Sequence, residues 1–148
     1  AEGQVLWTLS YGDSAPWPSG TDGEGRSLVY RGGEPNEAGS WRPSVSMDGN
    51  PGTSDRVPLM EGDNLVEYAI AEQQVMLEGE GFTLDVTSKS GADDISLTPA
   101  WSSDLEEWSG EGFTLLSQDP VGDGMVKQRW RMAGQSDAEK LFFRVTLE

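Results

Sequence analysis

The sequence predicts an all-β fold, an antiparallel β-sandwich with one short helix. Short apolar runs recur at regular intervals over residues 74–148, and turns rich in Gly, Asp and Ser separate them. Apolar and polar residues alternate near the N-terminus, as in a half-buried strand. Although only 35% of the residues are hydrophobic, 6 Trp, 4 Phe and 3 Tyr provide large side chains for a core.

Two strands are predicted in the first third of the chain. One covers residues 5–11, where the alternation occurs, and the other covers residues 27–31, with glycines near both ends. The apolar face of the first strand contains Val5, Trp7, Leu9 and Tyr11. Residues 34–55 are rich in Gly, Pro and polar side chains, so we predict a loop with Trp41 as a packing anchor. Residues 49–52 form a turn by composition.

A short helix is predicted directly after residues 56–63, which form the best candidate boundary in the chain. Its apolar face, at helical spacing, contains Leu65, Tyr68 and Ala69. Either Asp63 or Asn64 is a natural N-cap, because each side chain can accept hydrogen bonds from the first turn of a helix.

The remaining strands are predicted from the apolar runs between turns. They cover residues 75–78, 82–88, 95–101, 112–118, 125–132 and 142–147. Trp130 alternates with two arginines, so it is predicted to face inward. The predicted organisation is a partial β segment over residues 1–57, a linker with the helix over residues 58–73, and a β-sandwich domain over residues 74–148.

Four motifs near the N-terminus resemble the C-terminal half of a bacterial lamin-tail domain, in the order found in that family. They are Tyr11-Gly-Asp-Ser-Ala-Pro-Trp-Pro, Asp22-Gly-Glu-Gly-Arg-Ser-Leu, Ser40-Trp-Arg-Pro-Ser and Asp48-Gly-Asn-Pro-Gly. The resemblance covers about residues 4–55 and implies an immunoglobulin-like sandwich within a large secreted or surface protein. The family's N-terminal strands are then expected before Ala1, in a longer chain.

The rest of the chain resembles the C-terminal region of secreted proteins from Verrucomicrobia and Planctomycetes. The matching motifs are Asp63-Asn-Leu-Val-Glu-Tyr-Ala-Ile, Asp94-Ile-Ser-Leu followed by Ser102-Ser-Asp-Leu-Glu-Glu-Trp, and Phe142-Phe-Arg-Val-Thr-Leu. This resemblance implies a non-catalytic, fibronectin-like domain beside a catalytic or adhesive domain of the same chain. An extracellular or cell-surface location is implied with it.

Charge and composition exclude several functions. The 26 acidic and 10 basic residues give a net charge of −16, which repels nucleic acid and anionic membranes, so we expect neither as a partner. The chain has no Cys and no His, which excludes Cys/His zinc sites, disulfides, and Ser-His-Asp or Cys-His catalysis. Membrane insertion is not expected, because no apolar run approaches 18 residues.

Trp17 is the one candidate ligand-binding residue. It lies between Pro16 and Pro18, and such a rigid loop could present the indole ring as a platform for stacking a sugar. The alternative is that Trp17 closes one end of the sandwich. The packing anchors predicted elsewhere are Trp41, Trp101 and Trp108.

Acidic residues are the candidates for metal ligands and for catalytic groups. Carboxylates occur near glycines at Asp22, Asp93-Asp94 and residues 119–124, but the alternating Asp spacing of a calcium loop is absent from the sequence. Neighbouring carboxylates that could serve a glycosidase are Glu106 with Glu107 and Glu78 with Glu80. Because 26 acidic residues produce such pairs by chance, we predict solvated acidic turns, no catalytic residue, no metal and no cofactor.

The sequence therefore predicts a non-enzymatic structural or interaction module of an immunoglobulin- or fibronectin-like sandwich type. Its expected partners are other domains of the same parent chain and a cell-surface polysaccharide or protein. A carbohydrate-binding module that uses Trp17 is the alternative function, and a fragment of a hydrolase is a third hypothesis.

Overall fold

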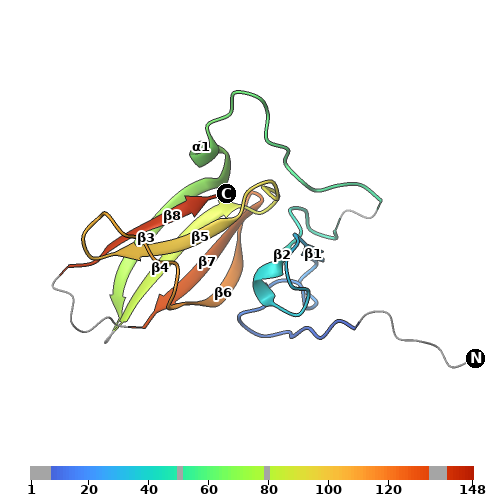
Figure 1. The fold of residues 1–148 in the computed structure, drawn as a ribbon. Helices are drawn as coiled ribbons and strands as arrows, with labels where there is room; N and C mark the ends of the chain where they lie inside the picture. Colours follow the sequence, from blue (N-terminus) through green and yellow to red (C-terminus); the bar gives the residue numbers. More distant parts are fainter. Residues whose placement is uncertain (1–7, 50–51, 79–80, 134–139) are drawn as a thin grey trace, which may run out of the picture.

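The computed structural model describes residues 8–49, 52–78, 81–133 and 140–148. Within these ranges the chain is an all-β antiparallel sandwich with one short α-helix (Figure 1). A segment over residues 8–57, here called the N-terminal segment, packs beside the sandwich and carries a small two-stranded sheet of its own. The fold class predicted from the sequence is confirmed.

The sandwich consists of two antiparallel sheets. The larger sheet has the strand order β3-β4-β7-β6, with β3 (Ile70–Glu78), β4 (Gly81–Lys89), β7 (Met125–Met132) and β6 (Phe113–Gly122). The smaller sheet pairs β5 (Leu97–Ser102) with β8 (Phe142–Leu147). If β3 to β8 are lettered A to F, the sheets are A-B-E-D and C-F, which is the constant-type immunoglobulin topology without strand G among the described residues.

The core lies between these two sheets. Leu84 and Val86 of the central strand β4 are each only 2% exposed. Phe143 of β8 packs between Phe82 and Phe113 of the larger sheet. The centroid of its ring lies 5.2 Å from that of Phe82 and 6.4 Å from that of Phe113. A second apolar cluster closes one end of the sandwich and contains Tyr68, Ala69, Ala92 and Ile95, flanked by Leu59, Ile70, Leu97 and Leu147.

The outer face of the larger sheet is polar. Asp85, at the middle of β4, is buried beneath two basic side chains of β7. Arg129 donates two hydrogen bonds to its carboxylate, at 2.7 and 2.8 Å, and the ammonium group of Lys127 lies 2.9 Å away. The hydrogen bonds from Arg129, helped by Lys127, outweigh burial and lower the pKa of Asp85.

The predicted strands of the sandwich are confirmed, with two extensions. β6 ends at Gly122, four residues after the predicted end at residue 118. β3 begins at Ile70, well before the predicted start at residue 75. The register of β3 shifts between Ile70 and Glu72, and the residues that follow are polar. The first half of β3 therefore shows no alternation of apolar and polar residues in the sequence. Trp130 lies opposite Leu84 and therefore on the inner face, as predicted.

The predicted helix is also confirmed, as α1 (Leu65–Ala69), with Asn64 as its N-cap. The Asn64 side chain accepts hydrogen bonds from the N–H groups of Val66 and Glu67, at 3.0 and 3.4 Å. Tyr68 and Ala69, at the C-terminal end of the helix, are buried and belong to the apolar cluster. Leu65 is 45% exposed, because only the C-terminal end of this single turn reaches the core.

The N-terminal segment differs from its prediction in two places. Residues 34–55 were predicted to be loop, but they contain η1 (Ala38–Ser40), a 3-10 helix, and β2 (Trp41–Pro43). β2 pairs with β1 (Leu28–Tyr30), which confirms the predicted strand over residues 27–31. β2 is too short to show alternation and contains a proline, so no strand pattern is visible in the sequence.

The predicted strand over residues 5–11 is wrong for the part that the structure describes. Residues 8–11 form no strand, and residues 5–7 lie outside the described residues, as do residues 50–51 of the predicted turn. The N–H group of Ser10 donates to Oδ1 of Asn36, at 2.9 Å, where a strand would make ladder hydrogen bonds.

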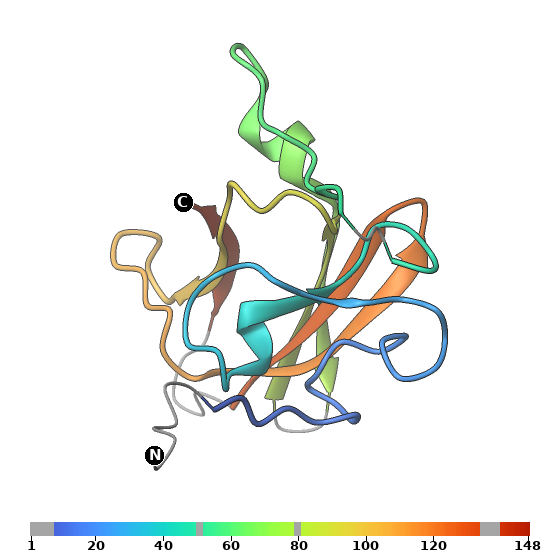
Figure 2. The same cartoon turned by 90° about the vertical axis from the view of Figure 1, so that its right-hand side faces the viewer.

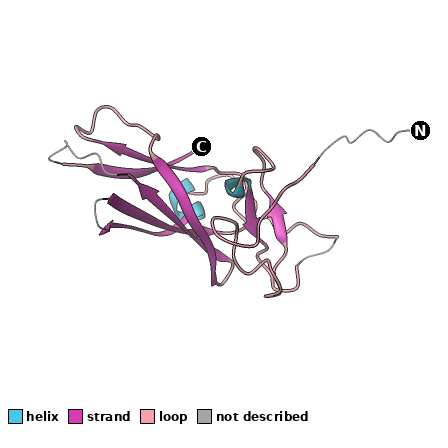
Figure 3. Cartoon of the chain, turned by 90° about the horizontal axis from the view of Figure 1, so that it is seen from below, coloured by secondary structure: helices cyan, strands magenta, loops and turns pink. Residues whose placement is uncertain are grey.

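The N-terminal segment covers one edge of the sandwich (Figure 2). Pro18 forms a parallel bridge with Gln118 of β6, and the N–H of Ser19 donates to the Gln118 carbonyl at 2.8 Å. The side chain of Gln118 is buried and donates to the Ala38 carbonyl at 2.9 Å. Seen from below, the sandwich strands and the β1–β2 pair lie on opposite sides of this junction (Figure 3). Trp41 is 9% exposed, which confirms it as an anchor.

Candidate functional site

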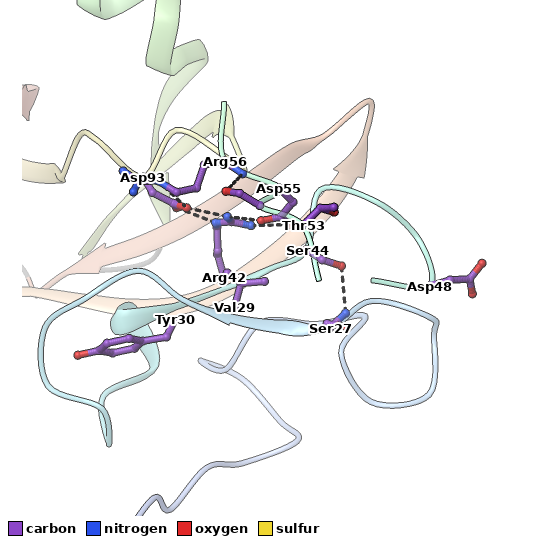
Figure 4. A pocket seen from close by; sticks show the side chains of 11 residues that line it. Ser27, Val29, Tyr30, Arg42, Ser44, Asp48, Thr53, Asp55, Arg56 and Asp93 are labelled. Carbon is purple, nitrogen blue, oxygen red and sulfur yellow. Dashed lines mark hydrogen bonds and ion pairs between the residues drawn. The ribbon is translucent and has the colours of Figure 1, made fainter. Parts of the chain in front are cut away.

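Arg42 is the centre of a buried ionic cluster at the junction (Figure 4). Its guanidinium donates from Nε and Nη2 to the two oxygens of Asp93, at 2.7 and 2.6 Å. It donates from Nη2 and Nη1 to the two oxygens of Asp55, at 2.7 and 3.1 Å, and from Nη1 to the Pro43 carbonyl at 3.2 Å. These contacts engage all five N–H donors of the guanidinium. We call Arg42, Asp55 and Asp93 the arginine clamp.

Hydrogen bonds and charges favour the ionised forms of Arg42 and Asp55. Burial by itself lowers the pKa of Arg42, but the hydrogen bonds and charges of Asp93 and Asp55 outweigh it and raise the pKa. The hydrogen bonds from Arg42 lower the pKa of Asp55 in spite of the partial burial of that carboxyl group. The side chain of Arg42 is 1% exposed and those of Asp55 and Asp93 are 8% and 7% exposed.

The arginine clamp joins three parts of the chain. Arg42 comes from β2, Asp55 from the strand-free stretch before the helix, and Asp93 from the turn that follows β4. The turn and the stretch approach closely, because Val57 donates to the Gly91 carbonyl at 2.8 Å. A Cβ atom on Gly91 would lie 2.6 Å from the Asp55 carbonyl oxygen, so only glycine fits there without a shift.

Two further arginines support the same turn. Arg31 donates to the Ile95 carbonyl at 2.9 Å, and burial lowers its pKa despite the nearby charge of Asp93. Arg56 hydrogen-bonds Asp94 and lies 3.9 Å from Asp93.

A cavity of about 440 Å³ lies beside the arginine clamp. Its lining includes Ser27, Tyr30, Ser44, Asp48, Thr53 and Arg56. Since every donor of Arg42 is already used within the protein, the clamp itself offers a ligand no free guanidinium N–H group. Its geometry is that of a structural junction.

The arginine clamp was not predicted from the sequence. The sequence around Asp93 indicates only an acidic turn, and no pattern marks Arg42 or Asp55 as site residues. The one available signal was that Arg42 is the only basic residue between Arg31 and Arg56.

Trp17, the predicted candidate, belongs to a chain of aromatic rings. Its ring lies 6.2 Å from that of Tyr11, in an edge-on arrangement, and 6.5 Å from that of Trp41. Trp41 in turn lies 5.0 Å from Tyr30, and its indole N–H donates to the Pro35 carbonyl at 2.7 Å. Trp17 is half-buried, so part of its ring is accessible to solvent.

The exposed part of Trp17 lines a cavity of about 610 Å³ between the N-terminal segment and the larger sheet. Trp130 of β7 lines the same cavity, as does Phe113 of β6. The polar groups along it include Glu34, Asn36, Glu37 and Thr114. The cavity thus combines aromatic surface with several hydrogen-bonding side chains, which is the usual composition of a small-ligand site.

A cavity of about 290 Å³ adjoins the cavity that Trp17 lines, since Gly39 and Trp130 line both. We call the two cavities together the tryptophan groove. Gln128, which is 4% exposed, also lines the second cavity, and its Nε2 donates to Gln118 at 3.1 Å. Oε1 of Gln128 has no hydrogen-bond partner among the described residues. An unpaired buried acceptor costs about 1–3 kcal/mol, so a donor from a ligand or water would be stabilised there.

The other predicted anchors make local contacts outside the tryptophan groove. The indole N–H of Trp101 donates to the Glu111 carbonyl at 3.0 Å. The guanidinium of Arg144 lies 4.1 Å from the centre of the Trp108 ring, a cation–π contact.

The carboxylate pairs considered above form no shared site in the described part of the chain. Glu106 and Glu107 are exposed, and their backbone N–H groups donate to Asp104, at 2.8 and 3.0 Å, which lowers the pKa of Asp104. The side chain of Glu78 and the whole of Glu80 lie outside the described residues. No group of three or more acidic residues is placed to hold a metal ion within the described ranges.

The fold is an antiparallel sandwich with the strand order of an immunoglobulin domain, and a buried arginine joins the N-terminal segment to the turn after β4. No protein-family model matches the chain, and comparison with curated proteins gives no match either. None of the helices in the described ranges is long and apolar enough to cross a membrane.

Proposed function

We propose that the chain is a non-catalytic structural and interaction module at the C-terminal end of a larger secreted or cell-surface bacterial protein. In this role it spaces, anchors or displays another domain of the same parent chain. The arginine clamp supports the proposal, because two hydrogen bonds from the buried side chain of Arg42 join the N-terminal segment to Asp93 of the sandwich. Three more hold the same guanidinium to Asp55 and Pro43 within the segment. A module that spaces or displays a neighbour needs such a fixed geometry between its two ends.

Unfolding experiments test the fixed geometry. Tryptophan fluorescence reports on both parts, through Trp17 and Trp41 of the N-terminal segment and through Trp101, Trp108 and Trp130 of the sandwich, while far-UV circular dichroism reports mainly on the sandwich strands. Urea unfolding followed by tryptophan fluorescence and by circular dichroism should give coincident transitions, because the two parts unfold as one unit. In Arg42→Met, part of the fluorescence change should precede the circular-dichroism transition, because the N-terminal segment is released before the sandwich unfolds. Separate transitions in the wild-type protein contradict the spacer role, and turnover on a panel of glycosides or esters contradicts a non-catalytic module.

A second candidate function is carbohydrate binding in the tryptophan groove. The observation in its favour is that Trp17 and Trp130 line one groove with carboxylate and amide groups. Aromatic faces pack against the apolar faces of pyranose rings, and the side chains of Glu34, Asn36 and Glu37 can accept or donate hydrogen bonds to sugar hydroxyls. With a net charge of −16 on the chain, a glycan without acidic groups fits best.

Glycan-array binding and calorimetry with matched tryptophan variants test this candidate. Trp17→Ala should lose binding, while Trp108→Ala should retain it, because Trp108 stacks with Arg144 away from the groove. Circular dichroism must first establish that both variants fold like the wild-type protein. Equal binding by the two variants, or no binding by the wild-type protein, contradicts a glycan site at Trp17.

A further inference from the structure

One edge of β8 is unpaired among the described residues. All six of its residues pair with β5 on one side. On the other side, the described residues contain no strand that pairs with it, and β8 lies at the margin of the smaller sheet (Figure 1). In the constant-type immunoglobulin topology, that position beside strand F belongs to a seventh strand, G.

On the inner face of the larger sheet, two apolar side chains of β3 are exposed to solvent. Val75 and Leu77 of β3 lie opposite Leu84 and Phe82 of β4, so their side chains are on the inner face of the sheet. Nevertheless they are 44% and 69% exposed, whereas Leu84 is 2% exposed. Exposed apolar side chains on a core-facing row indicate that a packing partner is missing.

The unpaired edge and the uncovered row belong to one position. Leu97 of β5 lines a cavity with Gln128 and Trp130 of β7, so β5 lies on the β7 side of the smaller sheet. The free edge of β8 therefore lies toward β3, the outermost strand of the larger sheet on that side. A strand placed there would pair with β8 and cover Val75 and Leu77. We call this the open strand position.

We propose that residues 4–9 of a second copy of this chain occupy the open strand position as an added strand. This segment carries Val5, Trp7 and Leu9 at alternate positions, which is the pattern of a strand with one buried face. It has six residues, as β8 has. The neighbouring described residues 8–11 join no sheet of their own chain. Strand addition of this kind combines backbone pairing with alternate apolar side chains.

The donor must come from another copy. Ser10 is held at Asn36, and the N-terminal segment lies against β6, the opposite edge of the larger sheet from β3. Crossing three strand spacings takes about 14 Å, and six extended residues span only about 20 Å, so too little chain remains to run along β8. Each copy has one donor and one open strand position, so the contact is head-to-tail and builds open chains or rings.

Charge sets the conditions for this association. Copies with a net charge of −16 repel one another, and salt screens that repulsion. Association should therefore be stronger at about 0.5 M than at about 0.05 M NaCl, the reverse of contacts that depend on ion pairs. This inference depends neither on the spacer role nor on glycan binding.

Sedimentation velocity on the full chain, with one donor variant and one acceptor variant, tests the proposal. Trp7→Asp removes the donor and Leu77→Asp the acceptor, and Leu77 is exposed enough for the variant to fold. Each variant alone should be monomeric, with the apparent dissociation constant raised about tenfold or more by the buried charge. A one-to-one mixture of the two should form dimers and stop there, since it retains one intact donor and one intact acceptor.

Val121→Asp is the control for these variants. It changes an exposed valine in β6 and should associate like the wild-type protein. Val75→Asp serves as a second acceptor variant if circular dichroism finds Leu77→Asp unfolded. A wild-type protein that is monomeric at all concentrations, a Trp7→Asp variant that still associates, or a mixture without dimers overturns the proposal.

Discussion

Arg42 and Asp93 are joined by two parallel hydrogen bonds, of 2.7 and 2.6 Å, although 51 residues separate them in the sequence. The pair links β2 of the N-terminal segment to the turn after β4 of the sandwich. Paired donors and acceptors of this kind fix orientation as well as distance. The pair therefore fixes the N-terminal segment on the sandwich together with the backbone contacts of Ser19 with Gln118 and of Val57 with Gly91.

Replacing Arg42 by methionine should strongly destabilise the protein. The change leaves the carboxylates of Asp55 and Asp93 buried without their partner, and breaking a buried ion pair in this way costs about 3–5 kcal/mol. Urea unfolding at neutral pH measures the loss. Arg56→Met is the matched control, because Arg56 is 53% exposed and its pairs should contribute less than about 1 kcal/mol. Equal losses in the two variants would contradict a dominant role for Arg42.

Acid should weaken the fold through Asp55. Hydrogen bonds from Arg42 lower the pKa of this carboxyl group in the folded state, so the unfolded chain binds its proton first as pH falls. The stabilisation is complete above the ordinary aspartate pKa, near about 4, and is lost as pH falls through the lower folded value. Asp85, with its pKa lowered chiefly by Arg129, acts in the same direction.

The measurement is the free energy of unfolding between about pH 7 and pH 2 for wild-type protein and Asp55→Asn. The variant should be less stable at neutral pH and should lose less stability on acidification, so the two curves converge in acid. Between about pH 6 and pH 8 neither curve should slope because of this group. Parallel curves over the whole range would mean that Asp55 is not coupled to Arg42 as the geometry requires.

The strands and the helix could be predicted because their signals are local. Alternation along β4 and β7, and an Asn directly before an apolar turn, lie within a few neighbouring residues of one another. The arginine clamp and the tryptophan groove could not be predicted in this way. Arg42 meets Asp93 only after two separate parts of the chain have packed, and Trp17 and Trp130 line one cavity for the same reason.

Residues 5–11 illustrate a different limit of sequence patterns. Their alternation describes a strand face correctly only if a sheet edge is available to pair with it. Within its own chain, the described part of this run bonds to Asn36 and packs against Trp17. The pattern thus states a preference for pairing, while the partner is decided by tertiary or intermolecular contacts.

Gly91→Ala should destabilise the junction. A Cβ atom at this position would meet the carbonyl oxygen of Asp55 at 2.6 Å and the backbone nitrogen of Val57 at 3.0 Å, so backbone would have to move. Overpacking of this kind typically costs about 1–3 kcal/mol. Gly39→Ala is the control, because a Cβ atom added there would have nothing within 4 Å and should not destabilise the protein. Thermal unfolding of both variants shows whether the steric contact of the added Cβ atom, rather than the loss of a glycine as such, causes the destabilisation.

Asn64→Ala should destabilise α1 and the apolar cluster beneath it. The helix has five residues, too few to be stable without its contacts, and the Asn64 side chain satisfies two of its free N–H groups. Loss of an N-cap costs about 0.5–2 kcal/mol, and here Tyr68 and Ala69 would lose part of their support. Asn64→Asp keeps the accepting oxygen and should retain most of the stability. Hydrogen exchange of the Val66 and Glu67 amides separates the causes: faster exchange in Asn64→Ala alone identifies the cap, and equal exchange in both variants rules it out.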